Sequence, residues 1–106
     1  MNNTALESLL EVARNEVQVT WADAETDKRL KRYIENGSRL LKKHCGVEDE
    51  DLQEGGKANA LLLAYVRRAF DGDISGFVND YIGDIVDLQL ESEVLAYEAE
   101  AETESL

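Results

Sequence analysis

The chain has 106 residues, the size of one compact domain, and 43% of them are apolar, which is enough to form a core. It carries 23 acidic and 11 basic residues, a net charge of −12, and no proline, whose absence favours helices over a β-rich fold. It has no apolar run of the ~20 residues that span a membrane, no signal-peptide pattern, and only one cysteine. These features predict an acidic, intracellular, all-α domain without disulfides.

The first predicted helix follows Thr4, because Thr4 and Glu7 have the spacing of a capping box, in which a hydroxyl and a carboxylate satisfy free amides. Apolar residues then recur at helical spacing, namely Leu6, Leu9, Leu10 and Ala13. Residues 17–21 (VQVTW) instead alternate apolar and polar side chains, and this pattern predicts a short extended link.

The second predicted helix begins between Asp23 and Asp27, whose side chains can cap it, and ends before Gly46, which suits a left-handed cap. Its core stripe consists of Leu30, Tyr33, Ile34, Gly37, Leu40, Leu41 and His44. The opposite side of this helix is basic and consists of Lys28, Lys31, Arg32, Arg39, Lys42 and Lys43.

The third predicted helix follows a loop at residues 47–56, which are mostly acidic and end in two glycines. It runs from about Gly56 to Phe70 and is apolar nearly all round, as is typical of a helix packed by neighbours on several sides. The Asp-Gly-Asp sequence at 71–73 ends it. We therefore expect this helix at the centre of the fold.

The fourth predicted helix runs from about Ile74 to at least Leu90, with a core stripe of Ile74, Phe77, Val78, Tyr81, Ile82, Ile85 and Leu88. Beside the stripe lies an acidic edge, which consists of Asp80, Asp84, Asp87 and Glu91. The remaining, outward arc holds Gly76, Asn79, Gly83, Val86 and Leu90. Two glycines inside a helix lower its stability, and they are best tolerated where another backbone comes close.

Residues 98–106 (EAEAETESL) are uniformly acidic and small, and they predict a disordered tail after a helical domain at 1–97. A role in solubility is the favoured interpretation of this tail, and a disordered docking segment is the alternative. The predicted fold class is thus an all-α, four-helix domain with a central apolar third helix, a short extended link after the first helix, and an acidic flexible C-terminal tail.

No residue pattern predicts a metal site, a cofactor or an enzyme. Residues 71–78 match the first eight positions of a calcium loop, but the twelfth position is Ile82 in place of the required bidentate Glu. His44 and Cys45 would need two further ligands to bind zinc, and the chain has no other His or Cys. For nucleophilic catalysis Cys45 lacks a separate base and an orienting group.

Charge is segregated along the sequence. Residues 28–43 hold seven of the eleven basic residues and one acid, whereas residues 71–106 hold eleven acids and no base. The basic side of the second helix is a solvated surface, a contact with another protein subunit, or a DNA-binding surface. The net charge of −12 repels DNA at long range, so a protein contact is the favoured interpretation.

Several segments together resemble the head-tail connector (head-completion adaptor) proteins of long-tailed bacteriophages, of the variety found in phages and prophages of low-GC Gram-positive bacteria. They are TWADAETD at 20–27, KRLKRYI at 28–34, Gly37, Leu40-Leu41, Gly46-Val47, AYVRR at 64–68, FVNDYI at 77–82 and LQLE at 88–91. The resemblance covers roughly residues 5–95. One departure is the pair of glycines in residues 71–76, where a more continuous helix start would be unremarkable, and it bears on where the fourth helix begins.

This resemblance implies a structural virion protein at the head-tail junction, assembled in the host cytoplasm. It implies a ring of copies of the chain below the portal protein, which extends the DNA channel and presents a platform to the next head-completion or tail protein. DNA would be present only as channel contents, and no enzymatic activity, cofactor or membrane is implied. The alternatives are a small acidic DNA mimic that blocks a host enzyme, or a regulatory helical binding protein.

A ring requires a heterologous interface, in which one face of a subunit meets a different face of its neighbour. The sequence offers a cationic face on the second helix, which consists of Lys28, Arg32, Arg39 and Lys43, and the acidic edge of the fourth. Gly76 and Gly83 lie near that edge and would allow close approach of a partner helix. A DNA mimic, in contrast, needs acids over an exposed face with few cations.

Overall fold

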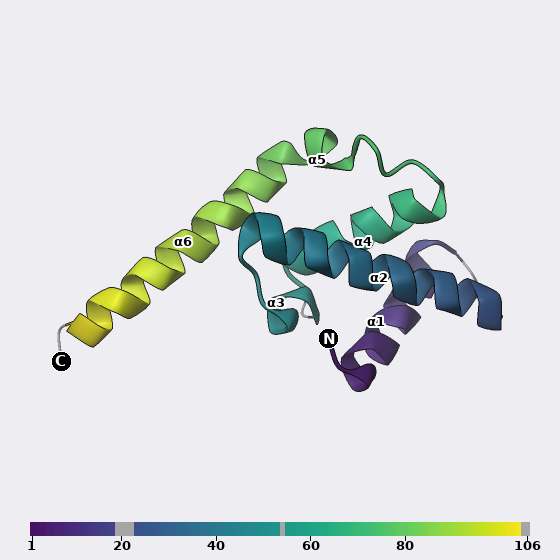
Figure 1. Ribbon diagram of the computed structural model, residues 1–106, viewed down its shortest axis with the longest axis horizontal. Coiled ribbons are helices and arrows are strands. Elements are labelled where there is room, and N and C mark those ends of the chain that lie inside the picture. Colours follow the sequence, from purple (N-terminus) through teal and green to yellow (C-terminus); the bar gives the residue numbers. More distant parts are fainter. Residues whose placement is uncertain (19–22, 54, 105–106) are drawn as a thin grey trace.

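The computed structural model describes the backbone of residues 1–18, 23–53 and 55–104, and the side chains of these residues up to 94. The described residues are mostly helical and include no β-strand, which confirms the predicted all-α class. Their helices are α1 (Asn3–Glu16), α2 (Ala24–Cys45), α3 (Asp49–Gln53), α4 (Lys57–Phe70), α5 (Phe77–Asp80) and α6 (Ile82–Glu104) (Figure 1). Within this part of the chain, no helix is long and apolar enough to cross a membrane.

Helix α4 packs against four other helices, α1, α2, α3 and α6. Its buried residues lie on several sides of the helix, namely Ala58, Leu61, Leu62, Ala64, Tyr65, Val66 and Ala69. This is the environment expected for a helix that is apolar nearly all round. Helix α2 packs along α4 and also contacts α1 and α6, while the second half of α6 projects beyond the other helices (Figure 1).

At Gly37, helix α2 packs directly on side chains of α4. A Cβ atom at this position would lie 2.7 Å from Cδ1 of Tyr65 and 2.8 Å from Cδ1 of Leu62, both shorter than van der Waals contact. The adjacent Ser38 is buried, and its hydroxyl donates a hydrogen bond of 2.7 Å to the carbonyl oxygen of Ile34, so no polar group is left unsatisfied there. Gly37 is therefore required by space at the crossing and not by backbone conformation.

The ends of α2 agree with the sequence prediction. Asp23 is its N-cap and accepts hydrogen bonds from the amide of Glu25 (3.3 Å) and the hydroxyl of Thr26 (2.8 Å). Gly46 is its left-handed C-cap, with φ of 68°. The buried side of α2 differs in part, because Ser38 and Cys45 are buried and His44 is exposed. Both α4 and α6 pack against α2. The contact with α6 buries Cys45, whose thiol lies 3.7 Å from the carbonyl oxygen of Ile85.

The start of α1 is a correction to the prediction. Asn2 caps the helix by accepting a hydrogen bond of 2.8 Å from the amide of Ala5, and Thr4 lies inside the helix. Asn is as good an N-cap as Thr, so the helix begins earlier. Most of the predicted extended link falls on residues 19–22, which lie outside the described residues. Of its described part, Val17 caps α1 and Gln18 is left-handed with φ of 62°, so Gln18 is not extended.

The predicted loop at 47–56 contains the short helix α3. The side chain of Leu52 is fully buried, and its carbonyl oxygen accepts a hydrogen bond of 2.7 Å from the side-chain amide of Asn59. One buried leucine and one contact from α4 thus fix a turn that its acidic composition would not predict. A local contact adds to them, because the carboxylate of Asp51 accepts a hydrogen bond of 3.0 Å from the amide of Glu48.

The predicted fourth helix is divided into α5 and α6. It does not begin at Ile74 but at Phe77, and it is interrupted at Tyr81, where φ is −110° and ψ is 18°. The ring of Phe77 packs on those of Tyr65 and Tyr81, with centroids 5.3 and 4.9 Å apart. Ile74 and Ile82, predicted to lie in the core, are exposed. Ile74 precedes α5 and is not part of either helix, and Ile82 lies at the outer edge of the face on which Phe77, Ile85 and Leu88 are buried.

The predicted disordered tail is not confirmed, because α6 continues across residue 97 to Glu104. Glu and Ala are good helix formers, and residues 98–104 contain no Gly or Pro that would end the helix. Residues 105 and 106 lie outside the described residues. In the described residues the acidic segment therefore continues α6 as far as Glu104.

An ion pair joins α1 to the start of α2. The guanidinium of Arg14 donates two hydrogen bonds to the carboxylate of Asp27, one of them 2.9 Å long from Nε. These hydrogen bonds hold the pKa of Asp27 below its usual range and raise that of Arg14. A carboxyl whose pKa is lower in the folded state stabilises the fold above its unfolded pKa, and this contribution disappears as the pH falls through the folded pKa.

We therefore expect Asp27→Asn to reduce the free energy of unfolding at neutral pH, by an amount that stays constant down to about pH 4, the pKa of an unfolded Asp. Below that pH the difference between the variant and the wild type should shrink, because the wild-type carboxylate becomes protonated. Urea unfolding of both proteins between neutral and acidic pH measures the difference. A difference that is unchanged at the lowest pH would contradict this role.

Candidate functional site

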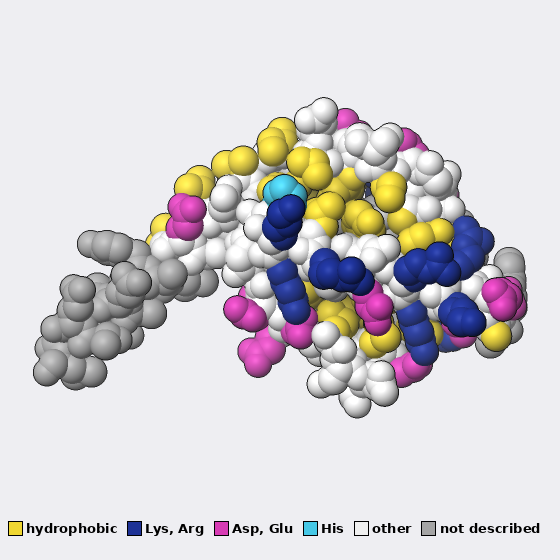
Figure 2. All heavy atoms as spheres, viewed as in Figure 1, with side chains coloured by type: hydrophobic (Ala, Val, Ile, Leu, Met, Phe, Trp, Pro, Cys, Tyr) yellow, Lys and Arg dark blue, Asp and Glu magenta, His cyan; other side chains and the backbone are white. Residues whose placement is uncertain are grey.

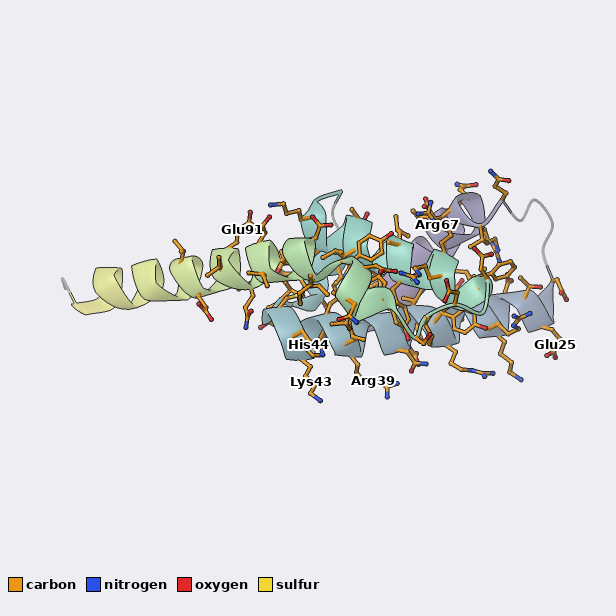
Figure 3. All side chains as sticks on the ribbon, turned by 90° about the horizontal axis from the view of Figure 1, so that it is seen from above. Glu25, Arg39, Lys43, His44, Arg67 and Glu91 are labelled. Atoms are coloured by element: carbon orange, nitrogen blue, oxygen red, sulfur yellow. The ribbon has the colours of Figure 1, made fainter. Side chains whose placement is uncertain are left out.

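The cationic face lies on one side of α2. Its four residues are spaced by four, seven and four positions, which places them on one line along a helix, and all four are exposed. A row of Lys and Arg side chains follows α2 in Figure 2, and Arg39 and Lys43 point away from the rest of the molecule in Figure 3. Among the described residues, none of the four forms an ion pair. Their charge is thus available to a partner.

The other basic residues of α2 have partners within the chain. Lys31 binds Glu7 of α1 (2.6 Å) and Lys42 binds Asp49 of α3 (2.5 Å), and Lys42 lowers the pKa of Asp49 by its hydrogen bond. The guanidinium of Arg29 lies over two rings of the chain, those of Tyr33 (6.0 Å) and Phe70 (5.5 Å). The basic side of α2 therefore separates into structural cations and the four residues of the cationic face.

Half of the acidic edge is also occupied. Asp80 accepts a hydrogen bond of 2.6 Å from Arg68, whose pKa this contact raises, and Arg68 also holds Asp73. Glu91 lies 3.4 Å from the ammonium of Lys57. Asp84 and Asp87 are exposed, and neither has an ion-pair partner among the described residues. The available negative charge of the edge is therefore concentrated at Asp84 and Asp87.

The two charged surfaces do not face each other within the chain. Glu91 lies on the side of the molecule opposite Arg39 and Lys43 (Figure 3). Asp84 and Asp87 precede Glu91 by seven and four residues and therefore lie on the same side of α6. The cationic face and the acidic edge consequently point in different directions and cannot neutralise each other in one molecule.

The two glycines near the edge have different surroundings. A Cβ atom at Gly83 would meet nothing within 4 Å, so this position offers open surface to a partner. A Cβ atom at Gly76 would lie 3.5 Å from Nη2 of Arg68 and 3.5 Å from a carboxylate oxygen of Asp80. Gly76 is thus covered by the chain's own ion pair, and of the two only Gly83 suits the predicted close approach.

An exposed apolar row on α6 was only partly foreseen from the sequence. We call it the α6 stripe, and its members and exposed fractions are Ile82 (51%), Val86 (41%), Leu90 (52%) and Val94 (54%). In Figure 2 hydrophobic side chains follow the upper edge of α6. The sequence placed Val86 and Leu90 on the outward arc but Ile82 in the core. The spacing of four residues, which places Ile82 and Val94 in line with Val86 and Leu90, is the sequence signal for the full row.

Three further features of the described residues bear on catalysis and ligand binding, namely a cleft, the thiol of Cys45 and the grouping of metal-ligating side chains. An open cleft of about 340 Å³ lies between the start of α4 and α6, with Lys57 and Glu91 among its lining residues. The thiol of Cys45 is buried and 3.7 Å from the carbonyl oxygen of Ile85, and burial raises its pKa, which disfavours the reactive thiolate. In the described part of the chain, no three His, Cys, Asp or Glu residues are close enough to hold a metal ion. The charged and apolar surfaces therefore remain the candidate functional site.

Comparison of the chain with models of protein families, with curated proteins and with solved structures gave no match. The resemblance to phage connector proteins therefore stays a prediction, based on the segments that carry it. The functional argument below uses the surfaces described above together with that resemblance.

Proposed function

We propose that the chain is a structural adaptor that assembles head to tail, and that it acts as a phage head-tail connector below the portal protein. The observation that carries this proposal is the pair of oppositely charged surfaces that point in different directions. The family resemblance supplies the context. In it the partners are further copies of the chain, the portal protein, and the next head-completion or tail protein, and the place of action is the head-tail junction of the virion.

Head-to-tail contact follows from the charges. A symmetric dimer through the cationic face would place Lys28, Arg32, Arg39 and Lys43 against the same four residues, and like charges repel. A contact between the cationic face of one copy and the acidic edge of the next pairs unlike charges and leaves one surface of each kind at the ends. Such a contact closes into a ring when its rotation permits.

The charged contact is weak in the isolated protein. Exposed ion pairs contribute only about 0–1 kcal/mol each, and salt screens them. We expect a monomer or small oligomer in dilute solution and a ring at high concentration or on the portal template. The alternative of a DNA mimic is disfavoured because it would have to tolerate four exposed cations without ion-pair partners among the described residues.

Reversal of charge tests this contact. Arg32→Glu with Arg39→Glu is expected to weaken self-association, and adding Asp84→Lys with Asp87→Lys to the same chain is expected to restore part of it, because the pairs are then exchanged. Sedimentation velocity over a range of protein and salt concentrations measures association. All variants should keep the wild-type melting temperature, since the four residues are exposed.

A matched control separates pairing from net charge. Adding Glu11→Lys and Glu50→Lys to the Arg32→Glu, Arg39→Glu chain gives the same net charge, but these exposed acids lie on α1 and α3. This control should not restore association. If the Asp84→Lys, Asp87→Lys chain restores no more than the control while both remain folded, the cationic face does not bind the acidic edge.

A further inference from the structure

We propose that the α6 stripe is the apolar centre of the contact between copies, and that a second copy of the chain covers it with the apolar border of its own α2. This inference deepens the proposed head-to-tail assembly and rests on it. The border consists of Tyr33 and Leu40 of α2 together with Phe70, the last residue of α4, and all three are half-buried. The charges that border the two surfaces favour a second copy of the chain as the partner that covers the stripe.

The α6 stripe is too long to be a random exposure of single apolar residues. Its four members span residues 82–94, or about 18 Å of helix, and each is at least 41% exposed. Scattered exposed apolar side chains are ordinary, but a continuous exposed row bordered by polar residues marks an interaction site. Ile85 and Leu88, on the other side of α6, already pack in the core, so the stripe is a second apolar face of the same helix.

Acidic residues border the stripe on both sides. Around Leu90 and Val94, Glu91 lies on one side and Glu93 on the other, and Asp87 lies beside Val86. The chain has no basic residue from position 71 to its end. Two copies that met through their α6 stripes, whether parallel or antiparallel, would bring these carboxylates together. The occupant must therefore present apolar side chains bordered by cations.

The α2 side of the same protein has this composition. Arg29 lies over the rings of Tyr33 and Phe70, at 6.0 and 5.5 Å. Leu40 follows Tyr33 by seven residues and so continues the border along the same side of α2. The cationic face runs beside it, and Figure 2 shows hydrophobic side chains next to the row of Lys and Arg. Apolar residues with cations on α2 thus complement apolar residues with acids on α6.

The two surfaces cannot meet within one molecule. Helix α6 already contacts α2 through its core side, where the thiol of Cys45 lies 3.7 Å from the carbonyl oxygen of Ile85. The stripe, on another side of α6, remains exposed. Contact between stripe and border therefore requires two chains, and it leaves one chain with an unused border and the other with an unused stripe. The contact is heterologous and can extend from copy to copy.

A matched pair of valines tests the apolar part. Val86 of the stripe and Val12 of α1 are exposed to nearly the same extent, 41% and 43%. Val86→Ser with Leu90→Ser is expected to weaken self-association by about tenfold or more, since residues at the centre of an interface carry most of its binding energy. Val12→Ser should leave association unchanged. An equal effect of both changes, or no effect of the stripe variant, overturns the proposal.

Cross-linking tests the direction of the contact. Asn36 lies on α2 between the cationic face and Leu40, and Asn36→Cys with Leu90→Cys places one thiol on each surface. A short bismaleimide should link this protein into a ladder of dimers, trimers and larger species. Each single variant should give no cross-linked species, and neither should Asn36→Cys with Val12→Cys. The buried Cys45 should not react in the wild type.

The outcomes separate this inference from the proposed function. A ladder from the double variant supports it. Dimers from Leu90→Cys alone mean that two α6 stripes meet, which overturns it. Absence of a ladder, while charge reversal still weakens and restores association, overturns the stripe contact but leaves the charged head-to-tail contact. Absence of a ladder together with failure of the charge-reversal test overturns both.

Discussion

Leu62→Asp is expected to abolish cooperative unfolding. Leu62 is fully buried in α4, the helix that packs against α1, α2, α3 and α6, and it also faces the close approach at Gly37. A buried carboxylate without a partner costs more than about 4 kcal/mol, which is a large part of the ~5–15 kcal/mol that stabilises a domain. Circular dichroism during heating should show a broad, noncooperative change, or the variant should be insoluble.

The same substitution at an exposed leucine is the control. Leu90 of α6 is 52% exposed, so Leu90→Asp should change the free energy of unfolding by no more than about 0.5 kcal/mol. If Leu62→Asp unfolds cooperatively at the wild-type temperature, α4 is not the centre of the core. Both variants replace a leucine by aspartate, so the comparison isolates the burial of that leucine.

Gly37→Val should destabilise the protein by about 1–3 kcal/mol, the usual cost of forcing extra atoms into a packed core. The first added carbon alone would lie 2.7 Å from the ring of Tyr65. That ring cannot readily move, because it packs edge-to-face on Phe77, which is itself buried. The helix propensity gained by replacing glycine is only roughly 0.3 kcal/mol and does not offset the clash. Urea unfolding measures the difference.

Gly83→Val provides the opposite case. This glycine also lies in a helix, but a Cβ atom there would meet nothing within 4 Å. The change should leave the free energy of unfolding the same or raise it slightly. Equal destabilisation by the two substitutions would mean that the α2–α4 crossing does not depend on Gly37.

The parts of the fold that were predicted from the sequence have local causes. Asp23 and Gly46 bound α2 by hydrogen bonds and backbone conformation that involve only neighbouring residues. Helix α4 was predicted because its apolar composition is itself the signal for burial. The exposure of the cationic face followed from helical periodicity alone.

The parts that were not predicted depend on distant residues. The helical turn of α3 requires the burial of Leu52 and a hydrogen bond from Asn59. The interruption at Tyr81 accompanies aromatic packing between Phe77 and Tyr65. Ile82 was misplaced because periodicity alone does not show how wide an arc of a helix its neighbours cover. Long-range contacts of this kind override the local periodicity.

The candidate site was likewise predicted only in part from the sequence. The sequence identified both charged surfaces, but it could not show that Arg68 already binds Asp80 and that Lys57 binds Glu91, because these partners come from α4. It therefore weighted four acids equally where two carry the available charge. The α6 stripe was incomplete because Ile82, at the edge of the predicted core stripe, is exposed.

Mixing two defective variants tests the head-to-tail contact most directly. One variant, Arg32→Glu with Arg39→Glu, loses the cationic face, and the other, Val86→Ser with Leu90→Ser, loses the α6 stripe. Alone, each should sediment as a monomer at concentrations where the wild type associates. An equimolar mixture should form a 1:1 dimer and nothing larger, because one intact surface remains on each chain. A mixture that stays monomeric while the wild type associates would contradict the head-to-tail contact.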